Sequence, residues 1–369
     1  MDFKELIGEK LSNLLLRQGI TASTPIQREA IPVILAKKDI IARSATGTGK
    51  TLAYLLPVFS RLDYNIRGAQ AIILAPTFEL CAQIYSVAKD LADNVDDVAL
   101  IIGSANKTRQ LETLKKKPKV IIGSIGRLTQ HIEDKKLSVH NVKTLVFDEA
   151  DRLFEPVFME SISKIIKSTL RDRQILLFSA SMPDNTIALA SEFMNNPTLL
   201  FLDDYLPKSI RHFYIRAEPR QKFDVLRKLI YAEKAEKTIV FVNIPYTIEK
   251  IATRLNFHKL EAMPLYGAAR KAERKHALTR FRLGRTKLLV SSDIGSRGLD
   301  INNLSHIINL DLPDSEKDYL HRAGRCGRMG ATGKVISIVT PKEAVILEKF
   351  ASKLGIEITQ KTLSFGKFL

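Results

Sequence analysis

The chain has 369 residues, of which 45% are hydrophobic and 26% charged, a composition typical of folded domains rather than of disordered chains. No apolar segment approaches the ~20 residues that span a membrane, and the start, MDFKELIGEK, lacks the apolar stretch of a signal peptide. The formal net charge of +17 favours a polyanionic partner, either nucleic acid or an anionic membrane surface.

Short apolar runs alternate with segments of helical length along the chain. In the first half these runs are 71–75, 98–102, 120–122, 144–147, 175–178 and 198–202, and in the second half they are 238–242, 262–265, 287–290, 306–310 and 335–339. Runs of this length are typical of strands buried on both faces of a parallel sheet. The alternation therefore predicts an α/β protein with helices on both faces of each sheet.

The alternation pauses near residue 203, which predicts a first domain at 1–203, a linker at 204–212 and a second domain at 213–369. The first 203 residues hold 26 Lys and Arg against 23 Asp and Glu, a net charge of +3. The rest holds 31 against 17, a net charge of +14, with the densest cluster at Arg270–Lys287. That cluster is either a solvated helix face or a surface that binds a polyanion.

The segment Asp39–Thr51, DIIARSATGTGKT, has the features of a phosphate-binding loop. Gly47 and Gly49 let backbone N–H groups approach phosphate oxygens, and the helix that follows favours negative charge. Lys50 would reach the β- and γ-phosphates, and the Thr51 hydroxyl would bind Mg²⁺. The strict G-x-x-x-x-G-K-T pattern fails only at its first position, which is Ser44.

Two further segments fit a nucleotide-hydrolysing site. In Thr144–Arg152, TLVFDEADR, an apolar strand ends at Asp148, which can hold Mg²⁺, and at Glu149, which can orient or deprotonate water. In His321–Arg328, HRAGRCGR, three arginines recur every third residue. If the segment is helical, they share one face and need acidic or phosphate partners.

Other motifs follow in a fixed order: Gly19–Gln27, Pro76–Leu80, Gly103–Ser104, Ser124–Arg127, Ser179–Ser181, Val240–Asn243, Tyr266–Arg274 and Ser292–Asp300. With the three segments above, they make the sequence resemble a DEAD-box ATP-dependent RNA helicase of the small bacterial type, without long terminal extensions. The resemblance covers residues 3–340. It implies two RecA-like domains, each a mostly parallel sheet flanked by helices, joined by a flexible linker, with ATP and Mg²⁺ as cofactors.

The resemblance also implies roles for single residues. The ATP-binding set is Gln27, which would recognise adenine, with Ser44, Ala45, Thr46, Gly47, Thr48, Gly49, Lys50, Thr51 and Asp300. The catalytic set is Lys50, Thr51, Asp148, Glu149, Arg325 and Arg328, in which Thr51 and Asp148 would hold Mg²⁺ partly through water. The RNA-binding set is Thr77, Gly103, Ser124, Gly126, Arg127, Ser292, Arg297 and Gly298. The residues implied to couple hydrolysis to RNA release are Ser179, Ser181 and His321.

Several positions depart from the family's usual pattern. Phe78 stands where Arg is usual, Ile125 where Pro is usual, Ser181 where Thr is usual and Lys271 where Gln is common. The ATP-handling residues are intact, so the departures put the coupling to RNA in question more than nucleotide binding. Phe78 either faces the RNA channel or packs in the interior, and the sequence leaves both open.

The sequence thus predicts a cytoplasmic, monomeric ATP hydrolase that binds RNA backbone without sequence preference and unwinds short duplexes or remodels ribonucleoproteins. Ribosomal or mRNA-associated proteins are candidate partners. An alternative is an ATP-gated RNA clamp or assembly scaffold with weak hydrolysis. A DNA helicase of the same superfamily and a membrane-surface protein are less favoured. The two cysteines, Cys81 and Cys326, suggest neither a disulfide framework nor a zinc site.

Overall fold

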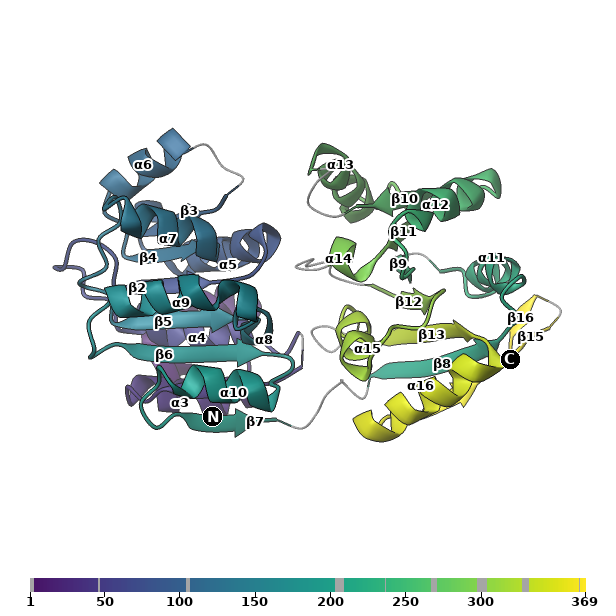
Figure 1. The fold of residues 1–369 in the computed structure, drawn as a ribbon, viewed down its shortest axis with the longest axis horizontal. Coiled ribbons are helices and arrows are strands. Elements are labelled where there is room, and N and C mark those ends of the chain that lie inside the picture. The colour runs from purple at the N-terminus through teal and green to yellow at the C-terminus, as the bar shows by residue number, and fades with distance from the viewer. Residues whose placement is uncertain are drawn as a thin grey trace. The chain divides into compact units, whose positions relative to one another are not determined.

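The computed structural model describes residues 3–45, 47–103, 107–202, 209–235, 237–266, 271–296, 304–326, 332–364 and 366–369. The chain divides into two compact units, Met1–Asp204 and Tyr205–Leu369. Each unit is built on its own seven-stranded sheet with helices on both faces (Figure 1). Within the described ranges, no helix is both long enough and apolar enough to cross a membrane.

The sheet of the first domain is wholly parallel, with the order β3-β4-β2-β5-β6-β1-β7. Its strands are β1 (Ile40–Arg43), β2 (Ala71–Leu74), β3 (Val98–Ile101), β4 (Val120–Gly123), β5 (Thr144–Asp148), β6 (Gln174–Ser179) and β7 (Thr198–Phe201). Because parallel strands all point the same way, every loop that follows a strand lies at one edge of the sheet. That edge is the carboxyl edge, where ligands of open α/β sheets bind.

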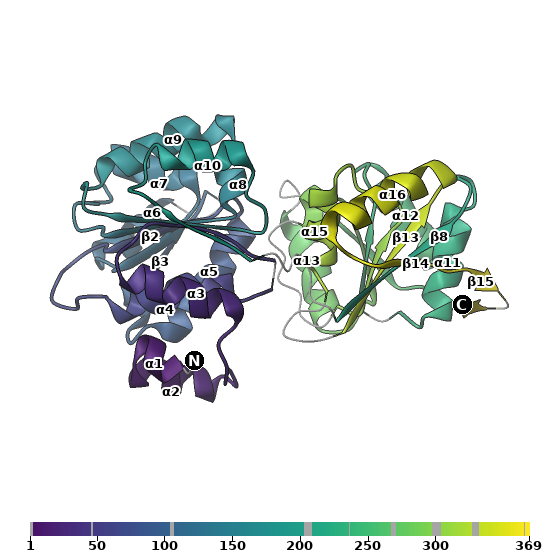
Figure 2. The same ribbon diagram turned by 90° about the horizontal axis from the view of Figure 1, so that it is seen from below.

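Helices cover both faces of this sheet (Figure 2). They are α1 (Phe3–Ile7), α2 (Glu9–Arg17), α3 (Pro25–Leu35), α4 (Lys50–Ser60), α5 (Phe78–Leu91), α6 (Lys107–Lys115), α7 (Ile125–Glu133), α8 (Ala150–Leu153), α9 (Pro156–Ser168) and α10 (Asp184–Ser191), with a short 3₁₀ turn at Val95–Asp97. One core joins α1–α5 to one set of strand residues, and the other joins α7–α10 to the alternate set. This alternation follows from the two-residue period of a strand.

The second domain has a parallel sheet with the order β10-β11-β9-β12-β13-β8-β14. Its strands are β8 (Ile210–Arg216), β9 (Thr238–Phe241), β10 (Ala262–Leu265), β11 (Leu288–Ser291), β12 (His306–Asn309), β13 (Gly333–Val339) and β14 (Ile358–Gln360). A short antiparallel pair, β15 (Leu363–Ser364) and β16 (Lys367–Phe368), follows. The three-layer α/β architecture predicted from the apolar runs is confirmed.

The helices of the second domain also lie on two faces. They are α11 (Lys222–Ala232), α12 (Thr247–Phe257), α13 (Lys271–Arg282), α14 (Asp293–Ser296), α15 (Glu316–Ala323) and α16 (Pro341–Leu354). One core contains α13, α15 and α16, and the other contains α11 and α12. Local signals set the ends of α16: Thr340 and Glu343 form a capping box, and Gly355 takes a left-handed φ of 62°.

Two strands differ from the expectation. Strand β8 begins at Ile210, so the end of the range 204–212, predicted as linker, lies in the sheet. Ile210 is buried and pairs with Gly333 of β13, and this burial favours strand over linker. No apolar run predicted β14, because its residues are only half-buried or exposed and form an edge. Residues 203–208 lie outside the described residues.

Candidate functional site

The predicted phosphate loop lies at the carboxyl edge, between β1 and α4. Ser44 Oγ donates to Thr48 Oγ1 at 2.8 Å, and Thr48 Oγ1 donates to the Ala45 carbonyl at 2.8 Å. Lys50 Nζ donates to the carbonyls of Ser44 and Ala45 at 2.6 and 2.7 Å. An ammonium binds a charged phosphate more strongly than neutral carbonyls. A phosphate entering the loop would therefore draw Lys50 away from these carbonyls.

Gln27 of α3 packs directly against this loop. Its Nε2 donates to the Gly49 carbonyl at 3.1 Å, and its Oε1 accepts from the Thr24 N–H at 2.9 Å. Gly49 has a φ of +90°, and a Cβ there would lie 2.5 Å from Gln27 Nε2, so the contact requires glycine. Gln27 is 2% exposed, and each end of its amide retains one hydrogen-bonding position. Adenine recognition by Gln27 stays a prediction.

Asp148 ends β5 beside the phosphate loop and is 4% exposed. Its Oδ2 accepts from the Tyr54 hydroxyl at 2.8 Å, and its Oδ1 accepts from the Glu149 N–H at 2.9 Å. Burial raises the pKa of Asp148, while the positive charge of Lys50 acts in the opposite direction. A divalent cation at this carboxylate would favour its charged form, so the residue fits a metal-binding role.

Glu149 has a strained backbone. It caps α8 with φ 53° and ψ 50°, the left-handed region that bulky residues rarely adopt. Such strain persists only where the surrounding structure holds it, and it is frequent at functional sites. Seven other described non-glycine residues also have a positive φ, so the prediction that Glu149 activates water rests on its place beside Asp148 at the end of β5.

Asp151 connects three of the predicted motifs. Its carboxylate accepts from Ser179 Oγ at 2.6 Å and from Ser181 Oγ at 2.5 Å. The Ser179 carbonyl in turn accepts from the Ser44 N–H at 3.0 Å. A displacement of the phosphate loop would therefore reach the two serines directly. The coupling role of Ser179 and Ser181 stays a prediction with this hydrogen-bond chain as its physical basis.

The predicted RNA-binding residues of the first domain gather along the same carboxyl edge, after β2, β3 and β4. Thr77 caps α5 by accepting from the Leu80 N–H at 3.2 Å. Arg127 Nη2 donates to the Gly103 carbonyl at 3.1 Å. Ser124 is the N-cap of α7, and Gly126 lies in its first turn. Free backbone N–H groups at helix starts suit phosphate contacts.

Phe78, the first residue of α5, lies next to this row. Its side chain is half-buried and packs against the core that contains α1–α5. The structure therefore favours the packing interpretation over the RNA-channel interpretation.

In the second domain, hydrogen bonds fix the position of the segment that follows β11. Ser292 Oγ accepts from the Gly295 N–H at 3.3 Å. Arg274 is buried, and its Nη1 donates to the Tyr266 carbonyl at 2.8 Å and also to the Gly295 carbonyl. A Cβ at Gly295 would lie 2.6 Å from the Leu265 carbonyl, so the chain approaches β10 closely there. This segment carries the predicted RNA-binding residue Ser292.

Arg322 is 1% exposed and belongs to a network inside the second domain. Its Nε and Nη2 donate to the Asp293 carboxylate at 2.8 and 2.7 Å. Its Nη1 donates to Asn309 Oδ1 at 3.2 Å and to the Asp311 carbonyl at 2.8 Å, and Nη2 donates to Asn243 Oδ1 at 2.8 Å. The Arg322 guanidinium is thus paired with an acidic residue of the same domain. We assign Arg322 a structural role.

Contrary to what the spacing predicts, the three arginines of His321–Arg328 do not all lie on one helix. Helix α15 ends at Ala323, and Gly324 is its C-cap, so Arg325 follows the helix and has different surroundings from Arg322. Arg325 is 9% exposed. His321, the predicted coupling residue, is half-buried on α15.

Several predicted residues lie outside the described residues: Thr46, Ser104, Arg297, Gly298, Asp300 and Arg328. Sequence reasoning, for its part, assigned no role to Tyr54, which holds Asp148, or to Asp293, which pairs with Arg322. A hydroxyl inside the apolar helix segment LAYLLPVF was the available signal for Tyr54.

The residues present fit Mg²⁺ bound together with a nucleotide. In the described part of the chain, no group of three or more His, Cys, Asp or Glu residues could hold a metal ion by itself. Mg²⁺ is usually bound by one or two carboxylates together with substrate phosphates and water. Asp148 and the Thr51 hydroxyl beside the phosphate loop match that pattern.

Comparisons with known proteins identify the family of the chain. A family model described as DEAD/DEAH box helicase matches residues 24–189, and one described as helicase conserved C-terminal domain matches residues 221–330. The chain is 42% identical over 355 residues to the DEAD-box ATP-dependent RNA helicase CshC of Bacillus cereus, covering 96% of this chain and 91% of CshC.

Two further similarities extend over nearly the whole chain. The probable ATP-dependent RNA helicase YfmL of Bacillus subtilis is 41% identical over 352 residues, covering 95% of this chain and 93% of YfmL. The structure of S. cerevisiae Dbp5 bound to RNA and ADP BeF3 has a TM-score of 0.87 at 29% identity, covering 97% of this chain and 95% of that one. The two sheets are therefore RecA-like domains, and the chain belongs to the DEAD/DEAH box helicase family.

Proposed function

We propose that this protein is an ATP-dependent RNA helicase that hydrolyses ATP and uses the energy to separate short duplexes or remodel RNA–protein complexes. The observation that carries the proposal is the hydrogen-bond chain from the phosphate loop through Ser179 to Asp151, which lies three positions along the chain from Asp148. It joins the nucleotide-binding loop to Ser179 and Ser181, the residues predicted to couple hydrolysis to RNA release. The names of the similar proteins CshC and YfmL support the same activity.

The chemistry divides among the residues of this chain. Lys50 and the loop N–H groups hold the phosphates, and Thr51 and Asp148 hold Mg²⁺, which supplies neutralisation of phosphate charge. Glu149 orients the attacking water and accepts its proton. Arg325 and Arg328 stabilise charge on the transferred phosphoryl group. Gln27 recognises adenine, and Asp300 completes the nucleotide contacts.

RNA contacts involve mainly the backbone. The first domain contributes Thr77, Gly103, Ser124, Gly126 and Arg127, and the second contributes Ser292, Arg297 and Gly298. Contacts of this kind recognise charge and shape, so binding is tolerant of sequence. Ser179, Ser181 and His321 link this surface to hydrolysis.

We further propose that the enzyme is monomeric and cytoplasmic, and that its partners are ribosomal or mRNA-associated proteins. Cys81 and Cys326 are both buried and form no disulfide with each other, which suits a reducing compartment. The two domains occupy 1–203 and, beginning with β8, 210–369.

The test is the steady-state ATPase rate of the full chain without nucleic acid, with single-stranded RNA and with DNA of the same sequence. RNA should raise the rate and DNA should not. A slow rate that RNA leaves unchanged, together with tight ATP-dependent RNA binding, would instead show an ATP-gated clamp. Equal stimulation by DNA would contradict the RNA assignment.

A further inference from the structure

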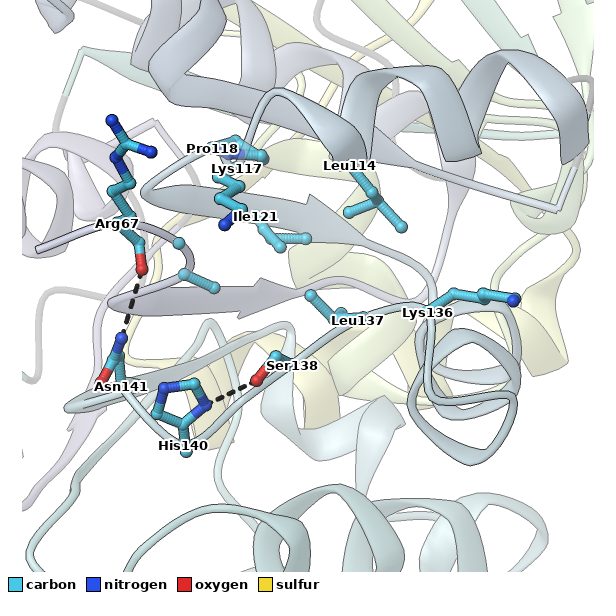
Figure 3. A pocket seen from close by; sticks show the side chains of 12 residues that line it. Arg67, Leu114, Lys117, Pro118, Ile121, Lys136, Leu137, Ser138, His140 and Asn141 are labelled. Carbon is cyan, nitrogen blue, oxygen red and sulfur yellow. Dashed lines mark hydrogen bonds between the residues drawn. The ribbon is translucent and has the colours of Figure 1, made fainter.

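A cavity of about 200 Å³ lies on the first domain, and Figure 3 shows the side chains that line it. Its lining residues Ala69 and Pro118 come just before β2 and β4, which places it at the amino edge of the sheet. The apolar part of the lining is formed by Ala69, Leu114, Pro118, Ile121 and Leu137. None of the proposed ATP- or RNA-binding residues lines it.

The polar part of the lining is basic. Arg67, Lys117 and Lys136 line the cavity together with His140, and no carboxylate does. All four are exposed. In the part of the chain that the structure describes, the three cationic side chains have no hydrogen bond or ion pair. Cations gathered in this way without a counter-charge attract an anionic ligand.

The loop that carries Arg67 is held firmly before any ligand binds. Lys119 Nζ donates to the Ile66 carbonyl at 2.8 Å, and Gln70 Nε2 donates to the Asp63 carbonyl at 2.6 Å. Asn141 Nδ2 donates to the Arg67 carbonyl at 3.2 Å, as Figure 3 shows. A wall ordered in advance loses little conformational entropy on binding.

A basic helix leads from the proposed RNA surface to this cavity. Helix α6 begins at Lys107, shortly after Gly103 at the carboxyl edge, and ends at Lys115 at the amino edge. The exposed basic residues along this path are Lys107, Arg109, Lys115, Lys116 and Lys117, against one exposed acid, Glu112. Lys107 and Lys116 are paired with Asp134 and Asp96, while the others keep their charge available. Nine helical residues span about 14 Å, a distance that a continuing RNA strand can cover.

We propose that the cavity is a second RNA-binding site, which takes a nucleotide of the strand that continues past the carboxyl edge. Its phosphate binds to Lys117, the neighbouring phosphates of the strand bind to Arg67 and Lys136, which lie on opposite sides of the cavity in Figure 3, and its ribose or base contacts the apolar lining. The path along α6 favours RNA over an acidic peptide, because it joins the cavity to the surface already proposed for RNA. The inference rests on the proposed function.

The experiment compares two double variants of the full chain. Lys117→Gln with Lys136→Gln removes two charges at the cavity. Lys37→Gln with Lys38→Gln removes two charges at the amino end of β1, on the same edge but at the other side of the sheet. The pairs are matched, since Lys117 and Lys37 have φ values of 57° and 60°. Thermal melting establishes that both variants are folded, and Arg67→Gln provides an independent cavity variant.

Affinity is measured for single-stranded RNA oligonucleotides of increasing length, across a series of salt concentrations. For long RNA, the cavity variant should lose about 1.4 from the slope of log affinity against log salt, or about 0.7 per lysine. At 0.1 M salt this is about a 25-fold loss relative to 1 M. For the shortest oligonucleotides, cavity and control variants should bind alike.

Other outcomes have separate meanings. If the cavity and control variants bind long RNA equally while RNA still stimulates the wild-type ATPase, the second site is wrong and the proposed function stands. If RNA fails to stimulate the wild type, the proposed function itself fails. Binding of polyglutamate, a probe for acidic proteins, is measured with the same variants. If the cavity variant loses polyglutamate binding while its RNA binding is unchanged, the RNA site is wrong and the cavity binds an acidic protein.

Discussion

Lys50 and Glu149 act at different stages of the proposed reaction, and this difference can be tested. Lys50 contacts phosphate in the ground state, whereas Glu149 acts on the water. Lys50→Ala should therefore weaken ATP binding and abolish turnover. Glu149→Gln keeps the shape of the side chain, so it should retain ATP binding and abolish turnover only.

Nucleotide titration and steady-state ATPase measurement on both variants check this prediction. The Lys50→Arg variant is the control: it keeps the positive charge but changes the geometry of the donor group, so it separates the effects of the two. Normal ATP turnover by Glu149→Gln would show that another residue activates the water.

The position of Phe78 indicates that its side chain contributes to the stability of the first domain. Because its ring packs against the core beneath the sheet, Phe78→Arg should lower the free energy of unfolding of the first domain by about 1–2 kcal/mol. Phe78→Leu keeps an apolar side chain and should lose less. Thermal melting beside an RNA titration is the measurement. Tighter RNA binding by Phe78→Arg at an unchanged melting temperature would show that position 78 faces the RNA channel.

Around helix α15, neighbouring arginines are expected to have opposite mutational signatures. Arg322→Ala would leave the Asp293 carboxylate without the cation that binds it through two hydrogen bonds. The Asp293 side chain is 30% exposed, so the loss should be smaller than the ~3–5 kcal/mol of a fully buried pair, but the second domain should still be destabilised. Arg325→Ala should lower ATP turnover even under conditions in which the variant remains folded, since an arginine that acts on the transition state contributes about 10³–10⁵-fold.

Urea unfolding and ATPase rates separate the two effects. A destabilised Arg325→Ala with normal turnover would contradict the assignment of this residue to catalysis.

The packing of β8 against α15 makes the second domain sensitive to acid. His212 Nδ1 is hydrogen-bonded to the Tyr319 hydroxyl at 2.9 Å, and burial lowers the pKa of His212 from 6.5 to about 4. Between these values the unfolded chain binds more protons than the folded one, so stability is full above pH 6.5 and falls below it. The loss reaches about 3 kcal/mol near pH 4.

His212→Gln should flatten this pH dependence in urea unfolding curves. Exposed His276, on α13, provides the control His276→Gln. Burial also lowers the pKa of His306, so part of the pH dependence should remain. An unchanged slope in His212→Gln would exclude His212 as the source.

The whole molecule carries its charge unevenly, with a net charge of +14 after residue 203. Helix α13 buries Ala277 and Phe281 and leaves Arg280 and Arg282 exposed, with Arg285 just beyond its end. If this face binds RNA, changing the three arginines to Gln should reduce the salt slope of RNA affinity by about 2, at about 0.7 for each charge.

The matched control removes three exposed lysines of the same domain, Lys342, Lys349 and Lys367. Fluorescence titration of labelled RNA over a salt series measures both. Equal slopes for the two triple variants would show that the α13 cluster is a solvated helix face.

Much of this protein was determined locally, by residue type and spacing. The apolar runs predicted most interior strands, because a strand buried on both faces needs a continuous apolar segment. They missed β8, in which Arg211, His212 and Arg216 interrupt the apolar residues. The loop ending in Gly49 and Lys50 and the carboxylates Asp148 and Glu149 predicted the nucleotide site, because each pattern carries its chemistry within a few residues. Strand β14 escaped detection because an edge strand with exposed residues has no such pattern.

Only the tertiary structure decided which partners distant residues meet. Arg322 and Arg325 look equivalent in the sequence, yet one is bound to Asp293 in the interior and the other follows the end of the helix. Phe78 could be placed only once α5 was seen packed on the core. The basic cavity joins Arg67, Lys117 and Lys136, which no sequence motif connects. They meet because the strand order places β4, β2 and β5 side by side, so that loops far apart in the chain share one edge.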